Sequence, residues 1–280
     1  MIKQIKKITK NKLDLFSPEE HQLSIQLCLD GFSFCIHNVL SNELVAFNRY
    51  DFDEKINDPF QHLELVKNVF SEETLLNHKY KNISVSHYNN LVTQVPKPLF
   101  DKNQLQTYLR YSIKTLENDF ITFDEIENSE IVNVYIPFVN INNFLIEIYG
   151  PFVYKHASTI LIEGLLKEFK NHSEPCCFVN VSSSSFEVVV FKDQKLELYN
   201  CFDYQTKEDF IYYILFTAEQ LNLNPEEFEL KIMGEIEKDS ELFEILYQYV
   251  RNITFYNPSN FPELLKNESP HSNYVVLNQF

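Results

Sequence analysis

The sequence of 280 residues predicts an α/β protein with mixed sheets, in which one β-β-β-α-β-α-β unit occurs twice. Alternating apolar residues mark three consecutive strands near the N-terminus, and three similar strands recur about 150 residues later. Each triplet is followed by segments of helical period and by further strand-like runs. Hydrophobic residues make up 44% of the chain, which is enough for a buried core.

In the first half, residues 23–29 carry an apolar side chain at every second position, and Asp30-Gly31 after them is a strong hairpin signal. The other elements predicted in this unit are strands at 32–37 and 44–47, a helix at 59–70, a strand at 82–86, a helix at 105–113 and a strand at 120–123. Between residues 131 and 170 the pattern predicts a strand, a helix, a strand and a helix.

The second half repeats the order. Its predicted elements are strands at 177–181, 186–191 and 196–202, a helix from Thr206 to about residue 221, a strand at 228–232, a helix at 239–251 and a strand at 253–256. Thr206 and Asp209 have the spacing of a capping box at the start of the first helix. The expected domains are a basic N-terminal tail at 1–20, a first domain at 21–128, a connecting segment at 129–174 and a second domain at 175–280.

Charge and composition argue against several classes of protein. The chain has 24 basic and 40 acidic residues, a formal net charge of −16, which argues against nucleic acid as a partner. No apolar run is long enough for a membrane-spanning helix, and Met1 is not followed by the apolar core of a signal peptide. The five cysteines, an odd number, are typical of free thiols in a reducing compartment, so we expect a cytoplasmic protein.

The N-terminus departs from the acidic balance of the chain. Five lysines and no acidic residue occur in its first twelve positions: Lys3, Lys6, Lys7, Lys10 and Lys12. Ile2, Ile5 and Ile8 recur every three residues, so one hypothesis is a short amphipathic helix that makes peripheral contact with an anionic membrane. The alternative is a flexible or self-docked terminus.

Several segments carry a resemblance to known proteins: residues 23–26, 29–34 and 95–100, and the order of helix, Gly150, strand and helix over 142–169. The duplicated unit resembles the actin, sugar kinase and Hsp70 superfold, whose ribonuclease H-like domains face each other across a nucleotide cleft. The second half is similar to PilM and FtsA proteins of pilus assembly and cell division. More specifically, the chain resembles an uncharacterised bacterial family of actin-like proteins, a domain of unknown function.

This resemblance implies ATP and Mg²⁺ as cofactors, held at three motifs that are altered in this chain. The two phosphate hairpins of active members read Asp-x-Gly, and the adenosine motif has paired glycines. The positions that match them, and hence the candidate nucleotide-binding residues, are Asp30, Gly31 and Ser33 in the first hairpin, Asn180, Ser182, Ser183 and Ser184 in the second, and Gly234 and Glu235 at the adenosine motif. Asn180 lacks the negative charge that would help to hold Mg²⁺.

Each candidate also has a plain structural explanation. Asp-Gly is a common hairpin turn, serine is frequent in turns, and a glycine often ends a strand for backbone reasons alone. The eight histidines show no metal-ligand spacing, and neither a Walker lysine motif nor G-x-S-x-G is present. We therefore assign no catalytic and no metal-binding residue.

Three functional hypotheses follow. The first is a non-catalytic actin-like protein, a pseudo-ATPase, that acts as a cytoplasmic binding or scaffold module for an unidentified protein partner. The second is a switch or weak ATPase of the same fold that binds ATP with Mg²⁺. The third is a membrane-associated cell-division or assembly component recruited through the basic N-terminus. The altered motifs favour the first, and the sequence leaves enzymatic activity and oligomeric state open.

Overall fold

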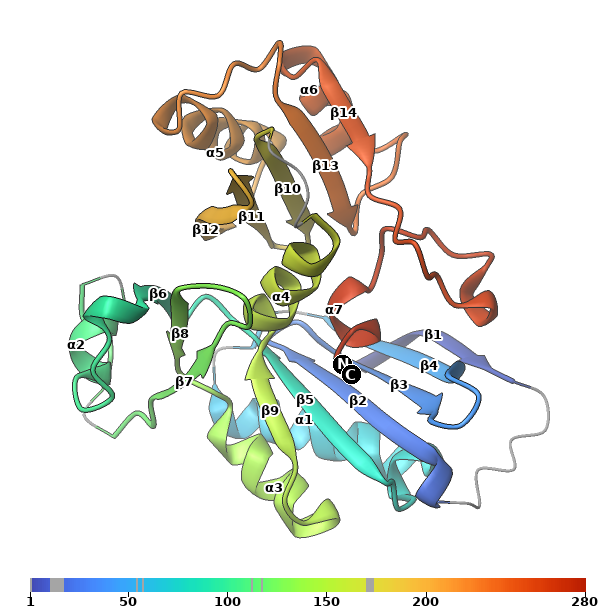
Figure 1. Ribbon diagram of the computed structural model, residues 1–280. Coiled ribbons are helices and arrows are strands. Elements are labelled where there is room, and N and C mark those ends of the chain that lie inside the picture. The colour runs from blue at the N-terminus through green and yellow to red at the C-terminus, as the bar shows by residue number, and fades with distance from the viewer. Residues whose placement is uncertain are drawn as a thin grey trace. The chain divides into compact units, whose positions relative to one another are not determined.

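The computed structural model describes residues 2–10, 18–53, 55–56, 58–111, 113–116, 118–169 and 174–280 (Figure 1). The chain divides into two compact units. Unit 1 comprises Met1–Leu161, Pro262–Lys266 and Val275–Phe280, and unit 2 comprises Ile162–Phe261 and Asn267–Tyr274.

Unit 1 is built on a six-stranded mixed sheet of order β1-β4-β3-β2-β5-β9. The strands are β1 (Ile2–Thr9), β2 (His21–Cys28), β3 (Gly31–Asn38), β4 (Glu43–Phe52), β5 (Asn82–Tyr88) and β9 (Val153–His156). β1 to β4 pair antiparallel along the sheet, whereas β5 is parallel to β2 and β9 is parallel to β5. The alternating residues Leu23, Ile25 and Leu27 of β2 are fully buried, as their period of two predicts.

Unit 2 contains a five-stranded sheet of order β12-β11-β10-β13-β14. Its strands are β10 (Cys176–Val181), β11 (Ser185–Lys192), β12 (Lys195–Asp203), β13 (Glu229–Gly234) and β14 (Asn252–Phe255). The first three pair antiparallel, β13 is parallel to β10, and β14 is parallel to β13. This order and these directions repeat those of β4-β3-β2-β5-β9 in unit 1, so the predicted mixed α/β fold with a duplicated unit is confirmed.

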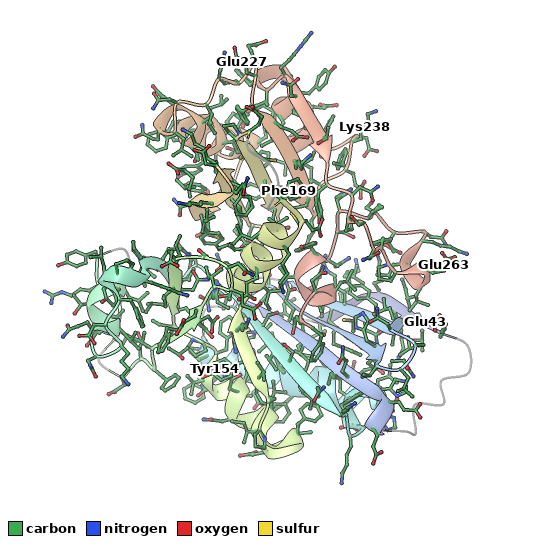
Figure 2. All side chains as sticks on the ribbon, viewed as in Figure 1. Glu43, Tyr154, Phe169, Glu227, Lys238 and Glu263 are labelled. Atoms are coloured by element: carbon green, nitrogen blue, oxygen red, sulfur yellow. The ribbon has the colours of Figure 1, made fainter. Side chains whose placement is uncertain are left out.

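Helices pack on both sheets. They are α1 (Pro59–Glu72), α2 (Leu105–Leu109), α3 (Val139–Tyr149), α4 (Ala157–Phe169), α5 (Lys207–Gln220), α6 (Glu241–Tyr249) and α7 (Tyr274–Leu277), with short 3₁₀ turns at Pro18–Glu20, Thr74–Asn77, Lys97–Leu99 and Glu263–Leu265. In unit 1, α1 and α3 pack against each other and cover the core of the large sheet (Figure 1). Tyr154 on β9 adds to this packing, with its ring 5.6 Å from that of His87 (Figure 2).

The end of the first unit differs from the prediction. The strand expected at 120–123 is β7 (Thr122–Glu125), which does not join the large sheet but forms a three-stranded antiparallel sheet with β6 (Val92–Pro96) and β8 (Ile131–Tyr135). This small sheet and α2 enclose their own core around Leu109 and Val134. The second helix and fifth strand of the unit are instead α3 and β9, from the range expected to be a connection, because β9 pairs with the free edge of β5.

The first residues do not form the amphipathic helix that was one of the two hypotheses for them, and they dock on unit 1, as the self-docked alternative allows. Ile2–Thr9 forms β1, which pairs antiparallel with β4, because the edge of β4 offers unpaired backbone groups to this β-branched segment. Lys10 Nζ lies 2.7 Å from Oε2 of Glu43, and Lys7 pairs with Glu73. Lys12 lies outside the described residues.

All five cysteines are free thiols. Cys35, Cys176 and Cys177 are buried, and burial raises the pKa of the Cys35 and Cys176 thiols to about 12. These thiols are neutral at pH 7 and act as core residues. No helix in the described ranges is long and apolar enough to cross a membrane.

Candidate functional site

Two of the three expected nucleotide motifs lie in unit 2, at the ends of the neighbouring parallel strands β10 and β13. Val181 is in register with Gly234, and Glu235 N donates a 2.7 Å hydrogen bond to Val181 O. Gly234 has φ of 87°, and a Cβ at this position would lie 2.1 Å from Val181 O. The structure thus brings Asn180, Gly234 and Glu235 together, and close backbone packing alone accounts for the glycine.

The side chain of Asn180 is bonded within unit 2. Its Nδ2 donates to Oε2 of Glu187 on β11 over 2.8 Å, and Tyr199 Oη donates to the other oxygen of Glu187 over 2.7 Å. Glu187 is fully buried, and desolvation raises its pKa to about 7. The sequence prediction missed Glu187, although a charged residue between Phe186 and Val188 was a signal that it needed an internal partner.

The serine turn between β10 and β11 is closed by backbone and side-chain hydrogen bonds. Ser182 N donates to Ser185 O over 2.8 Å. Tyr204 Oη donates to the carbonyls of Ser182 and Ser183 over 2.8 and 3.3 Å, and Tyr204 N donates to Ser184 O over 3.2 Å. All three serines named as candidates are therefore part of a tight turn anchored by one tyrosine.

Asp30, Gly31 and Ser33 belong to unit 1. The turn is tied to the end of β4, because Phe52 N donates to Asp30 O over 2.8 Å. A Cβ at Gly31 would lie 2.9 Å from Tyr50 O, so close approach of β4 requires glycine here. Ser33 lies within β3, in register with Gln26 and Arg49, and is 9% exposed.

The second hairpin does not present a carboxylate to a magnesium–nucleotide site. Asn180 has no charge, and its amide nitrogen is bonded to Glu187. Glu187 is the nearest carboxylate in that hairpin, but it is buried and each of its oxygens accepts a hydrogen bond. Within the described ranges, no group of three or more His, Cys, Asp or Glu side chains could hold a metal ion.

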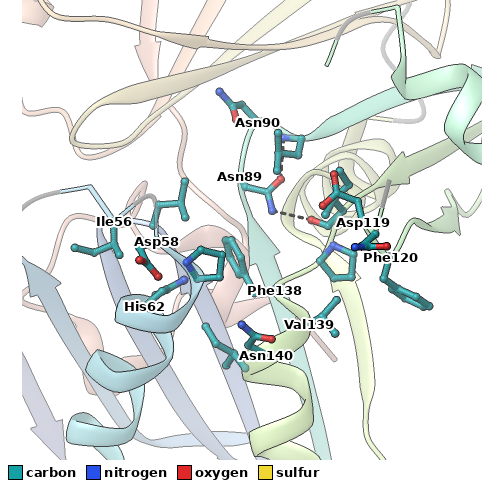
Figure 3. Close-up of a pocket in the computed structure, with 17 residues that line it drawn as sticks. Ile56, Asp58, His62, Asn89, Asn90, Asp119, Phe120, Phe138, Val139 and Asn140 are labelled. Atoms are coloured by element: carbon teal, nitrogen blue, oxygen red, sulfur yellow. Dashed lines mark hydrogen bonds between the residues drawn. The ribbon is translucent and has the colours of Figure 1, made fainter. Parts of the chain in front are cut away.

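A different feature of unit 1 has the dimensions of a binding site. A cavity of about 470 Å³ lies at the N-termini of α1 and α3 and extends to residues 118–120, and we call it the α1–α3 cavity (Figure 3). Its apolar lining includes Leu29, Ile56, Pro59, Phe120, Pro137 and Phe138. The sequence prediction missed this cavity because its lining comes from five separate stretches of chain.

A buried histidine forms part of the cavity wall. His62 on α1 is 2% exposed, and its ring lies edge-on to Phe138 with centroids 4.9 Å apart. Burial lowers the pKa of His62 to about 4, so the imidazole is neutral at pH 7. Its Nε2 has no hydrogen-bond partner among the described residues. Next to it, Phe138 N donates to Nδ1 of the buried His87 over 3.2 Å.

The charged residues of the cavity lining are both acidic. Asp58 caps α1, since its Oδ1 accepts hydrogen bonds from Phe60 N and Gln61 N over 2.7 and 3.2 Å. Asp119 Oδ2 accepts from Leu116 N over 2.7 Å. Among the described residues that line the cavity there is no lysine or arginine, so the two carboxylates disfavour an anionic ligand.

A second polar cluster in unit 1 combines Asp, His and Ser without forming a catalytic site. Asp124 accepts from His156 N over 2.7 Å and from Thr159 Oγ1 over 2.8 Å, and His156 Nδ1 lies 2.7 Å from Ser158 Oγ. Desolvation raises the pKa of Asp124 to about 6. His156 and Ser158 are fully buried, so the cluster joins β7 to the start of α4 rather than facing a substrate.

Comparison with known proteins agrees with the fold. Residues 10–253 match the model of a family described as a protein of unknown function, DUF3822. A Bacteroides thetaiotaomicron protein with actin-like ATPase fold and unknown function is 25% identical, with a TM-score of 0.79 over 89% of this chain and 96% of that one. A structure of the PilM–PilN type IV pilus biogenesis complex is 13% identical, with a TM-score of 0.59 over 94% and 98%. No curated protein matches the chain.

Proposed function

Because the chain belongs to the DUF3822 family of proteins of unknown function and has an actin-like ATPase fold, we propose that it is a non-catalytic binding or scaffold protein. In this proposal the fold serves to present surfaces to a protein partner in the cytoplasm. The acidic net charge of −16 argues against nucleic acid as that partner.

The observation that carries this proposal is the hydrogen bond between Asn180 and Glu187. Residues that position Mg²⁺ usually direct a carboxylate oxygen at the ion or its waters. Asn180 has a neutral side chain and donates its amide to a buried carboxylate of its own hairpin. This arrangement stabilises β10 and β11 and leaves the strand end without the acidic group that nucleotide hydrolysis in this superfold would use.

One structure of similar fold supports the proposal of a protein partner. The PilM relative was solved as a complex with PilN, and its likeness to this chain is one of fold. Two of the lysines on which the membrane-associated alternative depends, Lys7 and Lys10, form ion pairs within unit 1, which weakens that alternative.

Thermal unfolding with Mg-ATP, with Mg-ADP and without nucleotide tests the proposal. A nucleotide at 100 times its Kd would stabilise the native state by about 2.7 kcal/mol, which a shift in Tm reveals easily. We expect no shift at millimolar nucleotide. A clear shift that Asp30→Ala abolishes and Asp101→Ala retains would overturn the proposal in favour of the ATP-binding switch, and ATP hydrolysis that Asp30→Ala also abolishes would establish an enzyme.

A further inference from the structure

We propose that the α1–α3 cavity binds a short extended segment of a partner protein, in which large apolar side chains are flanked by lysine or arginine. This inference rests on the proposed binding function and names the surface and the chemistry of the partner. It follows from the size of the cavity, its polar lining and its charge.

The cavity has the size and the walls of a site for apolar side chains. Its volume of about 470 Å³ falls within the range of roughly 300–1,000 Å³ that is typical of ligand pockets. Ile56, Pro59 and Phe138 form the apolar interior of the cavity. Phe120 also lines it, and 53% of the surface of this residue is exposed. Covering a large aromatic ring and filling an apolar pocket are the contacts that dominate protein interfaces.

A polar group in the wall matches the backbone of a peptide. Asn140, in the first turn of α3, contributes an amide that both donates and accepts (Figure 3).

The two aspartates that line the cavity favour basic residues in the bound segment. Asp58 and Asp119 lie on opposite sides of the cavity in Figure 3. Each binds backbone amides through one oxygen, and the second oxygen takes no hydrogen bond from the described part of the chain. Since the described lining contains no lysine or arginine, a basic residue of the partner would meet two carboxylates, and a phosphate group would be repelled.

The experiment selects peptides from a phage-displayed library of random dodecapeptides with the full chain as target. We expect enrichment of sequences that combine leucine or phenylalanine with lysine or arginine. A labelled synthetic copy of an enriched sequence is then titrated by fluorescence anisotropy. Asp58→Asn combined with Asp119→Asn should weaken binding by about tenfold, because asparagine retains the capping acceptor but removes the charge. Phe120→Ala, at a half-exposed position, should weaken it by a similar factor.

The controls separate binding from folding. Asp101→Asn alters an exposed turn aspartate that accepts from Asn103 N and does not line the cavity, so it should leave peptide affinity unchanged. Equal Tm values for all variants establish that each is folded. The inference is overturned by enrichment of acidic sequences, by no enrichment at all, or by peptides that bind the cavity variants as well as the parent. Any of these results without a nucleotide shift leaves the proposed non-catalytic function standing, whereas a Mg-ATP shift contradicts that function itself.

Discussion

Lys7 in the first strand and Glu73 after the first helix form an ion pair in which Nζ lies 2.8 Å from Oε2. Glu73 is 1% exposed, and the same oxygen accepts from Asn48 Nδ2 over 2.7 Å and from Tyr50 Oη over 2.9 Å. Burial acts to raise the pKa of Glu73, but hydrogen bonds from Lys7 and Tyr50 outweigh it and hold the pKa below its ordinary value. β1 thus supplies the positive charge for a carboxylate inside unit 1.

Replacing Lys7 by methionine should lower the free energy of unfolding by about 1–2 kcal/mol, because a buried carboxylate loses its only cationic partner among the described residues. Urea unfolding measures this change. Lys10→Met removes the exposed pair with Glu43 and should change stability by about 0.5 kcal/mol or less. Equal effects of the two substitutions would contradict a special role for Glu73.

The pH dependence of the Lys7 effect has a defined sign. The folded pKa of Glu73 lies below its unfolded value near 4.5, so the stabilisation is complete above that pH and is lost as the pH falls through the folded pKa. The difference in unfolding free energy between the parent and Lys7→Met should therefore shrink below pH 4.5. A difference that grows on acidification would disprove this linkage.

The start of α5 gives a prediction for a local interaction. Thr206 Oγ1 accepts from Asp209 N over 3.1 Å, and Asp209 Oδ2 accepts from Thr206 N over 3.0 Å, so the predicted capping box is confirmed. Thr206→Ala should destabilise unit 2 by about 1 kcal/mol, and Thr206→Ser should be close to neutral. Thermal unfolding of the two variants checks this order, and an alanine variant as stable as the serine variant would speak against the cap.

Features of this kind, set by neighbours in sequence, were predictable. The capping box depends on residues three positions apart, and the hairpins of β2–β3 and β10–β11 depend on alternation within one strand and on the turn that follows. The three antiparallel strands that begin each repeat follow from these local patterns, and so does the likeness to the actin-like fold.

Features set by distant pairing were not predictable. The spacing of Ile2, Ile5 and Ile8 suits a helix, but the free edge of β4, some forty residues away, makes the segment a strand. Glu187 lies in β11, where residues on both faces are buried, and its charge signals the need for an internal partner, but no local pattern identifies Asn180 and Tyr199 as those partners. His62 and Phe120 reach the same cavity from different segments, which no local pattern indicates.

Gly234 gives a sharp steric prediction. Its φ of 87° and the 2.1 Å approach of Val181 O leave no room for a Cβ, so Gly234→Ala should destabilise unit 2 by about 3 kcal/mol or more. Gly150 has a similar φ of 77° with nothing within 4 Å of a Cβ, so Gly150→Ala should cost only about 1–2 kcal/mol. Urea unfolding compares the two, and equal losses would mean that backbone strain rather than close packing requires Gly234.

The pair of Asn180 and Glu187 predicts the pH dependence of unit 2. The pKa of buried Glu187 is raised from about 4.5 in the unfolded chain to about 7 in the folded protein. Between these values the native state binds a proton that the unfolded state does not, so stability falls as the pH rises from about 4.5 to 7 and then levels. Asp124, with a pKa raised to about 6, adds a decline of the same sign in unit 1.

Glu187→Gln isolates the contribution of this one residue, because glutamine keeps the shape of the side chain and does not titrate. The difference in unfolding free energy between parent and variant should change by roughly 2–3 kcal/mol between pH 4.5 and 7, in favour of the variant at the higher pH. Urea titrations at several pH values measure it. Asp124→Asn, tested in parallel, should flatten the dependence only up to about pH 6. A Glu187→Gln difference that stays constant with pH would mean that Glu187 is ionised throughout, and that the hydrogen bonds from Asn180 and Tyr199 hold a charged carboxylate rather than a neutral one.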